Sequence, residues 1–266
     1  IESAAALAIV PYALGGRCDV WASPQPGSPA LATDTYEREV GLDARLRIGG
    51  STNIDVTLNT DFAQVEVDDQ QVNLTRSSLF FPEKRLFFQE RASLFDFSFG
   101  PTDRAFHSRR IGLAGSQRTR ILGGVRAVGK AGDFEGGLLS MQTQGRASAS
   151  GENLSVLRLK RRVLNENSTI GVIGTSRTDL AGAYNALYGA DATLRVQAEH
   201  FLSLRWAQSF SGVDPAETTA MDRARLFIEM ADRSPLGFTY GVSWSRSGAA
   251  FDPGIGFQSR ADLSRL

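Results

Sequence analysis

The sequence is poor in the residues that build disulfides, metal centres and catalytic triads. It contains one cysteine, Cys18, and two histidines, His107 and His200, among 266 residues. A single cysteine excludes an intramolecular disulfide and a cysteine-based zinc cluster. Two histidines leave little room for a histidine metal site or a triad. We therefore expect the protein to work without a cofactor.

The chain also lacks an excess of charge and a long apolar run. Its 29 Lys and Arg residues balance its 29 Asp and Glu residues, whereas a general nucleic-acid-binding protein is usually basic. Nucleic acid is therefore not an expected partner. The longest apolar stretches, such as residues 4–10, fall well short of the roughly 20 residues of a membrane-spanning helix.

In place of long apolar runs, the sequence alternates apolar and polar residues. Alternation over several residues predicts β-strands with one apolar and one polar face. The pattern predicts about eleven strands joined by turns rich in Gly, Ser, Asn or Pro, with longer connections at 17–35 and 211–221. The clearest segments are residues 40–48, 54–58, 184–197, 202–210, 224–230 and 238–244. Weaker segments are residues 4–14, 118–130, 133–143, 153–163 and 168–177.

The length of these segments favours a membrane-spanning barrel. Strands of soluble sandwiches usually run about 5–6 residues, whereas about 9–11 tilted residues cross a bilayer. We therefore predict an all-β, antiparallel up-and-down transmembrane β-barrel, closed or incomplete, with membrane lipid against its apolar face. The alternative is a soluble β-barrel binding protein or twisted sheet with a solvated face. Aromatic residues near the segment ends suit interfacial girdles: Tyr184, Phe210, Phe238 and Trp244.

The polar face of the strands would line the interior of such a barrel. In an open pore, rings of charge set the preference for ions and solutes, whereas in a closed barrel such charges satisfy one another. The pattern leaves both possibilities open. The candidate lumen-facing residues are Arg195, Glu199, Arg205, Arg225 and Glu229.

Residues 61–100 break the alternation. Seven of the 16 phenylalanines lie between Phe80 and Phe99, and so many aromatic rings must be buried somewhere. We predict that this segment is a plug inside the barrel or a lid at one mouth, either as a rigidifying loop or as a binding site. A short helix is expected at Leu74–Phe80, capped by Asn73. The residues expected to form the plug are Phe80, Phe81, Pro82, Glu83, Lys84, Arg85, Phe87, Phe88 and Glu90.

Acidic residues at the start of this segment are candidates for a calcium site. Asp61, Glu66 and Asp68 could supply the hard oxygen ligands that Ca²⁺ takes. Their spacing does not match an EF-hand loop, so turn formation and salt bridging are the favoured roles.

No catalytic motif stands out. The chain lacks a G-x-S-x-G sequence, and its Gly-Gly pairs lack the Lys-Ser/Thr of a phosphate loop. His107 and His200 are interpreted as structural, since no serine can be matched to either. A hydrolase carried on the barrel is the least favoured hypothesis, and no catalytic residue is assigned.

Two linked motifs resemble the DUF5916 family. The first is N-x-D-F-x-Q-V-E-x-D at Asn59–Asp68, and the second is N-L-T-R-x-x-L-F-F-P-E-K-R-x-F-F-x-E at Asn73–Glu90. Residues 7–14 (LAIVPYAL) and 251–262 (FDPGIGFQSRAD) also look like family landmarks. The resemblance implies a bacterial protein that ends in an outer-membrane β-barrel and often carries an N-terminal domain like the family 9 carbohydrate-binding modules.

The resemblance also implies how the chain is organised. We expect residues 1–266 to form a single β-barrel domain with residues 61–100 as its plug or lid. A carbohydrate-binding-like domain would precede Ile1, and further strands would follow Leu266. The favoured hypothesis is an outer-membrane barrel that binds or passes a glycan or a small solute. The alternative is an outer-membrane anchor without transport.

Overall fold

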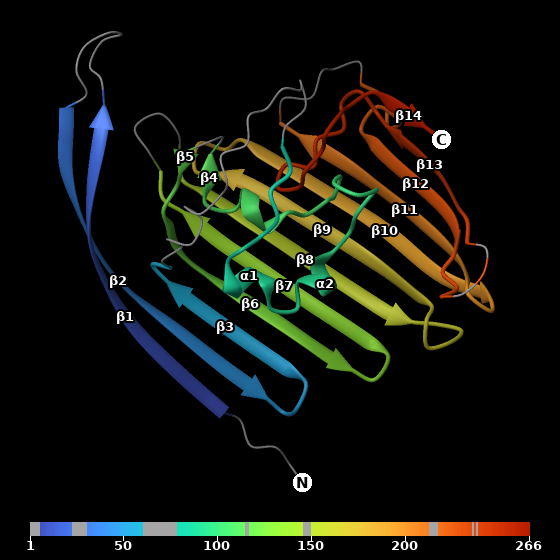
Figure 1. Ribbon diagram of the computed structural model, residues 1–266, viewed down its shortest axis with the longest axis horizontal. Coiled ribbons are helices and arrows are strands. Elements are labelled where there is room, and N and C mark those ends of the chain that lie inside the picture. Colours follow the sequence, from blue (N-terminus) through green and yellow to red (C-terminus); the bar gives the residue numbers. More distant parts are fainter. Residues whose placement is uncertain are drawn as a thin grey trace.

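The protein is an antiparallel β-structure. The computed structural model describes residues 6–22, 31–60, 79–114, 117–145, 150–212, 218–235, 237 and 239–266. In these ranges twelve strands form one sheet in which neighbours in space follow one another along the chain (Figure 1). The strands are β1 (Ala6–Ala22), β2 (Leu31–Ile48), β3 (Thr52–Leu58), β6 (Ile121–Ala131), β7 (Phe134–Thr143), β8 (Glu152–Arg162), β9 (Thr169–Asp179), β10 (Tyr184–Gln197), β11 (His200–Ser211), β12 (Ala224–Asp232), β13 (Gly241–Ser247) and β14 (Leu263–Arg265).

Between β3 and β6 the chain leaves the sheet. Within the described part, no helix has the length and hydropathy of a membrane span. The smaller elements of this region are α1 (Leu86–Gln89), α2 (Ala92–Phe95), the 3-10 helix η2 (Ser108–Arg110) and the hairpin of β4 (Leu113–Ala114) with β5 (Gln117–Arg118).

The eleven predicted segments correspond to β1 to β3 and β6 to β13, which confirms the all-β antiparallel fold. The long connection predicted at residues 17–35 is wrong, because β1 and β2 continue as a ribbon with backbone pairing as far as Ala22 and Leu31. The sequence of this ribbon shows no alternation, so the pattern did not predict it. The short β14 was not predicted. Of the expected helix at 74–80, residues 74–78 lie outside the described ranges and residues 79–80 are not helical.

The sheet is open. Its edge strands are β1 and β14, and no pairing joins them within the described ranges. A barrel closes only when its first and last strands pair, and here β14 contributes three residues. The described residues therefore do not form the closed barrel that was one of the two predicted forms.

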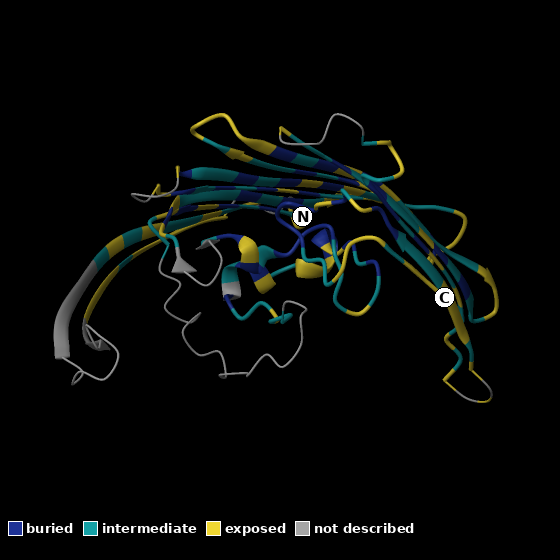
Figure 2. Ribbon diagram, turned by 90° about the horizontal axis from the view of Figure 1, so that it is seen from above, coloured by how far each residue is buried: buried dark blue, intermediate teal, exposed yellow. Residues whose placement is uncertain are grey.

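The two faces of the curved sheet differ in composition. Side chains alternate between faces along each strand, and the strand registers align them across the sheet. Figure 2 shows the inner segment, which we define as residues 79–112, beneath the concave face. Apolar side chains of the convex face are exposed on every strand from β2 to β13 in this sheet. They include Leu42, Val56, Leu58, Leu122, Phe134, Leu138, Leu157, Leu159, Ile170, Val172, Tyr188, Leu204, Ile228, Met230 and Val242.

The hydrophobic core lies between the concave face and the inner segment. The sheet contributes buried apolar side chains from β6 to β12, so its concave face is not uniformly polar as the alternation predicted. From the other side come the aromatic rings of the inner segment, together with Phe251 and Ile255 near the C-terminal end. The core residues of the sheet include Val128, Leu139, Met141, Leu154, Val156, Ile173, Leu187, Ala207 and Phe227.

Candidate functional site

Arg126 of β6 connects the sheet to the inner segment. It is 1% exposed, and its Nη2 lies 2.7 Å from Asp55 Oδ2 and 3.0 Å from Glu90 Oε2. Its Nη1 donates to the carbonyls of Phe87 and Glu90. Arg45 of β2 also binds the Glu90 carboxylate, at 2.5 Å. One guanidinium therefore holds both a neighbouring strand and the end of α1.

Two further arginines of the sheet bind the inner segment. Arg158 of β8 forms a two-pronged pair with Asp191 of β10 at 2.6 and 2.9 Å, and its Nε donates to the carbonyl of Leu94. Arg225 of β12 binds the carboxylate of Asp103 at 2.5 Å. Buried charges are stable only when paired and hydrogen-bonded. These contacts fix the inner segment above β6, β8 and β12.

The Arg158–Asp191 pair has room because Gly171 lies beside it on β9. A Cβ at Gly171 would lie 2.7 Å from Arg158 Nη1, 2.8 Å from Asp191 Oδ1 and 2.9 Å from the carbonyl oxygen of Leu159. We expect Gly171→Ala to lower the free energy of unfolding by about 1–3 kcal/mol, as overpacking does. Denaturant titration followed by tryptophan fluorescence would measure this change.

Gly174 on the same strand is the matched control for this prediction. A Cβ there would meet nothing within 4 Å. Gly174→Ala should leave stability unchanged or raise it slightly, because alanine has less backbone entropy to lose. Equal losses at the two glycines would show that the ion pair does not require Gly171.

The predicted lumen-facing charges make separate local contacts. Arg195 pairs with Glu199 at 2.5 Å beside the β10–β11 turn. Arg205 lies over the ring of Phe227. Arg225 is buried under the inner segment rather than open to solvent. Glu229 lies 3.9 Å from Arg233.

The described part of the predicted plug, residues 79–100, lies on the concave face. Phe88 is buried and Phe87 packs beside it, edge to face. Arg109 lies over the ring of Phe81, and Lys84 is half-buried. The calcium candidates Asp61, Glu66 and Asp68 lie outside the described residues, as does the girdle candidate Phe238. The described ranges contain no cluster of ligands suited to a metal ion.

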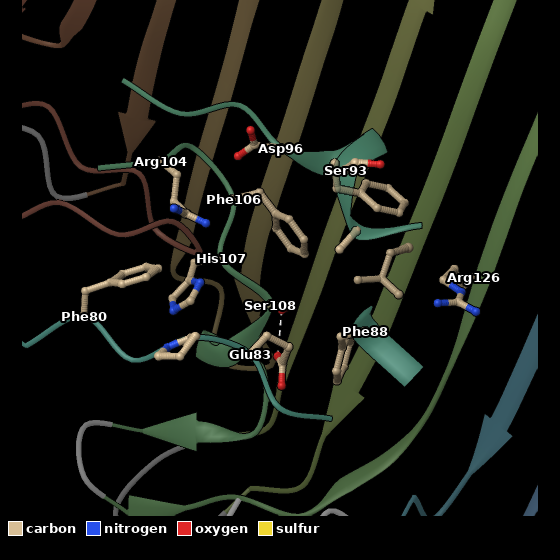
Figure 3. Close-up of a pocket in the computed structure, with 14 residues that line it drawn as sticks. Phe80, Glu83, Phe88, Ser93, Asp96, Arg104, Phe106, His107, Ser108 and Arg126 are labelled. Carbon is tan, nitrogen blue, oxygen red and sulfur yellow. Dashed lines mark hydrogen bonds between the residues drawn. The ribbon is translucent and has the colours of Figure 1, made fainter. Parts of the chain in front are cut away.

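A cavity of about 340 Å³ lies between the inner segment and strands β6 and β7. The sheet contributes Arg126 and Leu139 to its wall. In Figure 3, Asp96 and Arg104 lie at one end of the cavity and Arg126 at the other, with Phe106 and Phe88 between them. The inner segment contributes Phe80, Pro82, Glu83, Phe88, Ala92, Ser93, Phe95, Asp96, Arg104, Phe106, His107 and Ser108.

Glu83 is ionised in this wall. Burial would raise the pKa of its carboxyl, but hydrogen bonds from Arg85 and Ser108 outweigh burial and hold the pKa below its usual range. Arg85 lies 2.7 Å from Glu83 Oε2, and Ser108 Oγ donates to the same oxygen at 2.7 Å. This arrangement fixes Pro82 and the chain around it, and it leaves the Ser108 hydroxyl bound to a carboxylate.

His107 is neutral at pH 7. Burial and the nearby positive charge of Arg104 lower its pKa to about 4. Its ring packs against Phe80, with 4.9 Å between ring centroids. His200 lies 3.2 Å from the hydroxyl of Tyr240 at the start of β11. Within the described ranges, no serine hydroxyl is hydrogen-bonded to either histidine.

Several residues of the site were not singled out from sequence: Asp96, Arg104, Arg126 and Arg158. The alternation of apolar and polar residues places Arg126 and Arg158 on the polar face of their strands. This alternation is the sequence signal from which both arginines could have been predicted. Asp96 and Arg104 lie outside the regular strands and helices. They line the same cavity because Ser98 pairs with Arg104, and no local sequence pattern predicts this pairing.

Comparison with known proteins matches part of the chain to a family model. The family model described as "Domain of unknown function (DUF5916)" matches residues 9–126. No curated protein and no solved structure matches the chain. The matched range includes both linked motifs and the whole inner segment, whereas residues 251–262 lie beyond it. The match over residues 9–126 confirms the resemblance to the DUF5916 family that the motifs at 59–68 and 73–90 indicated.

Proposed function

We propose that the sheet is the wall of a bacterial outer-membrane β-barrel and that the inner segment is a plug beneath which a glycan or a small solute binds. The observation that carries this proposal is the division of the sheet into an apolar convex face and a concave face with buried charges. Lipid would cover the convex face, and the plug would cover the concave face. A closed wall requires strands that pair with the outer edges of β1 and β14.

The convex face supports contact with lipid rather than water. Exposed apolar side chains extend over the sheet from β2 to β13, with Ile228 43% and Val242 59% exposed. Soluble monomers rarely expose apolar patches larger than a few hundred Å². Strands β6 to β11 are 10 to 14 residues long, which suits the roughly 9–11 tilted residues of a membrane crossing.

The attachment of the plug favours binding over free passage. Arg126, Arg158 and Arg225 hold it at three positions across the sheet. If the plug left its place, these buried ion pairs would break, and breaking a buried pair costs free energy. The cavity beneath it is where a solute could be retained, and an anchor without a ligand is the alternative.

Quenching by brominated lipid tests the membrane part of the proposal. Trp206 and Trp244 lie on the convex face, opposite Leu226 and Ile228 in the strand registers. The full chain with Trp21→Phe would be refolded into vesicles whose acyl chains carry bromine. We expect strong quenching of tryptophan emission relative to vesicles without bromine, because the indole rings contact acyl chains.

A control variant moves the indole to the other face. Ser243 is exposed on the concave face of β13. In a variant with Ser243→Trp and with phenylalanine at positions 21, 206 and 244, the emission should escape quenching. A folded chain that stays out of the vesicles, with unquenched emission, would overturn the membrane assignment.

A further inference from the structure

We propose that the cavity beneath the plug binds a small zwitterion with an ammonium group, a carboxylate and an apolar body, which is the chemistry of a free apolar amino acid. This inference rests on the proposed solute-binding function and names the class of solute. It begins from the position of two opposite charges at one end of the cavity.

A two-stranded ribbon within the plug places these charges together. Ser98 and Arg104 form an antiparallel bridge, and the carbonyl of Phe97 accepts a backbone hydrogen bond at 2.9 Å from the facing strand. This register sets Asp96 opposite Phe106. Because side chains alternate between faces, Asp96, Phe106 and Arg104 share one face of the ribbon. All three line the cavity.

The ribbon is held on its other side as well. The backbone of Arg104 exchanges two hydrogen bonds with Phe257, at 2.8 and 2.9 Å, and the amide of His107 donates to the carbonyl of Ile255 at 2.9 Å. A backbone fixed from both sides presents its side chains without further ordering. A preorganised site of this kind loses little entropy when a ligand binds.

Other charges of the cavity wall are already neutralised by the protein. Glu83 is paired with Arg85, and Arg126 is paired with Asp55 and Glu90. Because these pairs are short and their arginines are buried, they leave little charge for a ligand.

Asp96 and Arg104 remain, with opposite signs. Within the described residues, Asp96 is exposed and makes no hydrogen bond or ion pair, although it interacts electrostatically with Arg205 of β11. Arg104 lies over the ring of Phe80, 4.5 Å from its centroid, and donates to the carbonyls of Thr102 at 3.3 Å and Pro101 at 3.4 Å, which are long hydrogen bonds. No ion pair joins Asp96 to Arg104 in this part of the chain.

The spacing of the two charges suits an amino acid. Diagonal neighbours on an antiparallel ribbon lie about 7–8 Å apart, within reach of long side chains. The ammonium group of the ligand would bind Asp96 and its carboxylate would bind Arg104. The apolar body would pack against the rings of Phe88, Phe95 and Phe106. A volume of about 340 Å³ lies at the small end of ligand sites, which span about 300–1000 Å³.

Binding of four probes to the full chain in detergent micelles tests the inference by calorimetry. L-phenylalanine carries both charges, phenethylamine only the positive one and 3-phenylpropionate only the negative one, while maltotriose is a neutral glycan. We expect L-phenylalanine to bind at least about tenfold more tightly than either single-charge analogue. Each analogue lacks one charge-assisted hydrogen bond, and the loss of one such bond lowers the affinity by about this factor. Equal affinities, or binding of maltotriose alone, would overturn the inference.

Substitutions assign each charge to its partner. Asp96→Asn should weaken the binding of L-phenylalanine and phenethylamine by about tenfold or more and leave the binding of 3-phenylpropionate unchanged. Arg104→Gln should weaken the binding of L-phenylalanine and 3-phenylpropionate by a similar factor and leave the binding of phenethylamine unchanged. Arg104→Lys should restore part of the affinity, and Asp133→Asn, in the exposed β6–β7 turn, should change nothing. Unchanged binding in both cavity variants would refute the assignment.

Lipid quenching on the same samples separates this inference from the proposed function. Insertion into vesicles without binding of L-phenylalanine would overturn only the choice of solute. Binding without insertion would support the cavity and overturn the outer-membrane role.

Discussion

Replacing Asp191 with leucine should lower the free energy of unfolding by about 3–5 kcal/mol. The side chain of Arg158 is 1% exposed and that of Asp191 is 9% exposed, so the substitution leaves a buried guanidinium without its counter-charge. Arginine does not lose its proton to escape this cost. Denaturant unfolding in detergent micelles, followed by tryptophan fluorescence, would measure the change.

Two controls distinguish an unpaired charge from lost packing. The double variant Asp191→Leu with Arg158→Met should recover most of the stability, because apolar side chains replace a buried pair at little cost. Glu199→Gln breaks the half-exposed pair with Arg195 and should cost less than about 1 kcal/mol. A double variant as unstable as the single one would show that the loss came from packing.

Introducing arginine at Ile228 should cost about 2–4 kcal/mol if this position lies near the middle of the bilayer. Ile228 is exposed on the convex face of β12, opposite Leu204 and Trp244. In lipid, the guanidinium loses its hydration, whereas on a water-exposed surface such a substitution usually changes stability by less than about 0.5 kcal/mol. Unfolding of the chain from lipid vesicles would measure the difference.

Ser243 provides the matched position for this comparison. It lies opposite Glu229 on the concave face and is exposed. Ser243→Arg should be close to neutral, since the new charge has water and a carboxylate beside it. Similar costs at positions 228 and 243 would contradict the assignment of the convex face to lipid.

Much of the sheet could be predicted because its two faces have different surroundings. Tyr188 and Leu204 alternate with residues such as Asp191 and Arg205, and this contrast is local, so a short window of sequence carries it. Residues 17–35 lack this alternation of apolar and polar residues. Their strands are defined only by the backbone pairing of β1 with β2, which the sequence pattern does not show. The end of the sheet at β14 has only three residues and no pattern.

The site could be predicted only in outline. The aromatic run from Phe80 to Phe99 indicated a buried segment, and it lies on the concave face. Which charges meet could not be read from the sequence, because Arg126 and Asp55 are 71 residues apart and Arg225 and Asp103 are 122 apart. With 29 basic and 29 acidic residues, the pairs depend on strand register and on the path of the inner segment.

The position of the inner segment in the chain has a consequence for folding order. Strands of the sheet pair with their neighbours along the chain, so the hairpins form through short loop closures. The inner segment precedes β6, yet it contacts Arg158 and Arg225, which lie far downstream. These contacts close loops much longer than those of the hairpins, so the slow steps of folding should arise where the inner segment docks on β8 and β12.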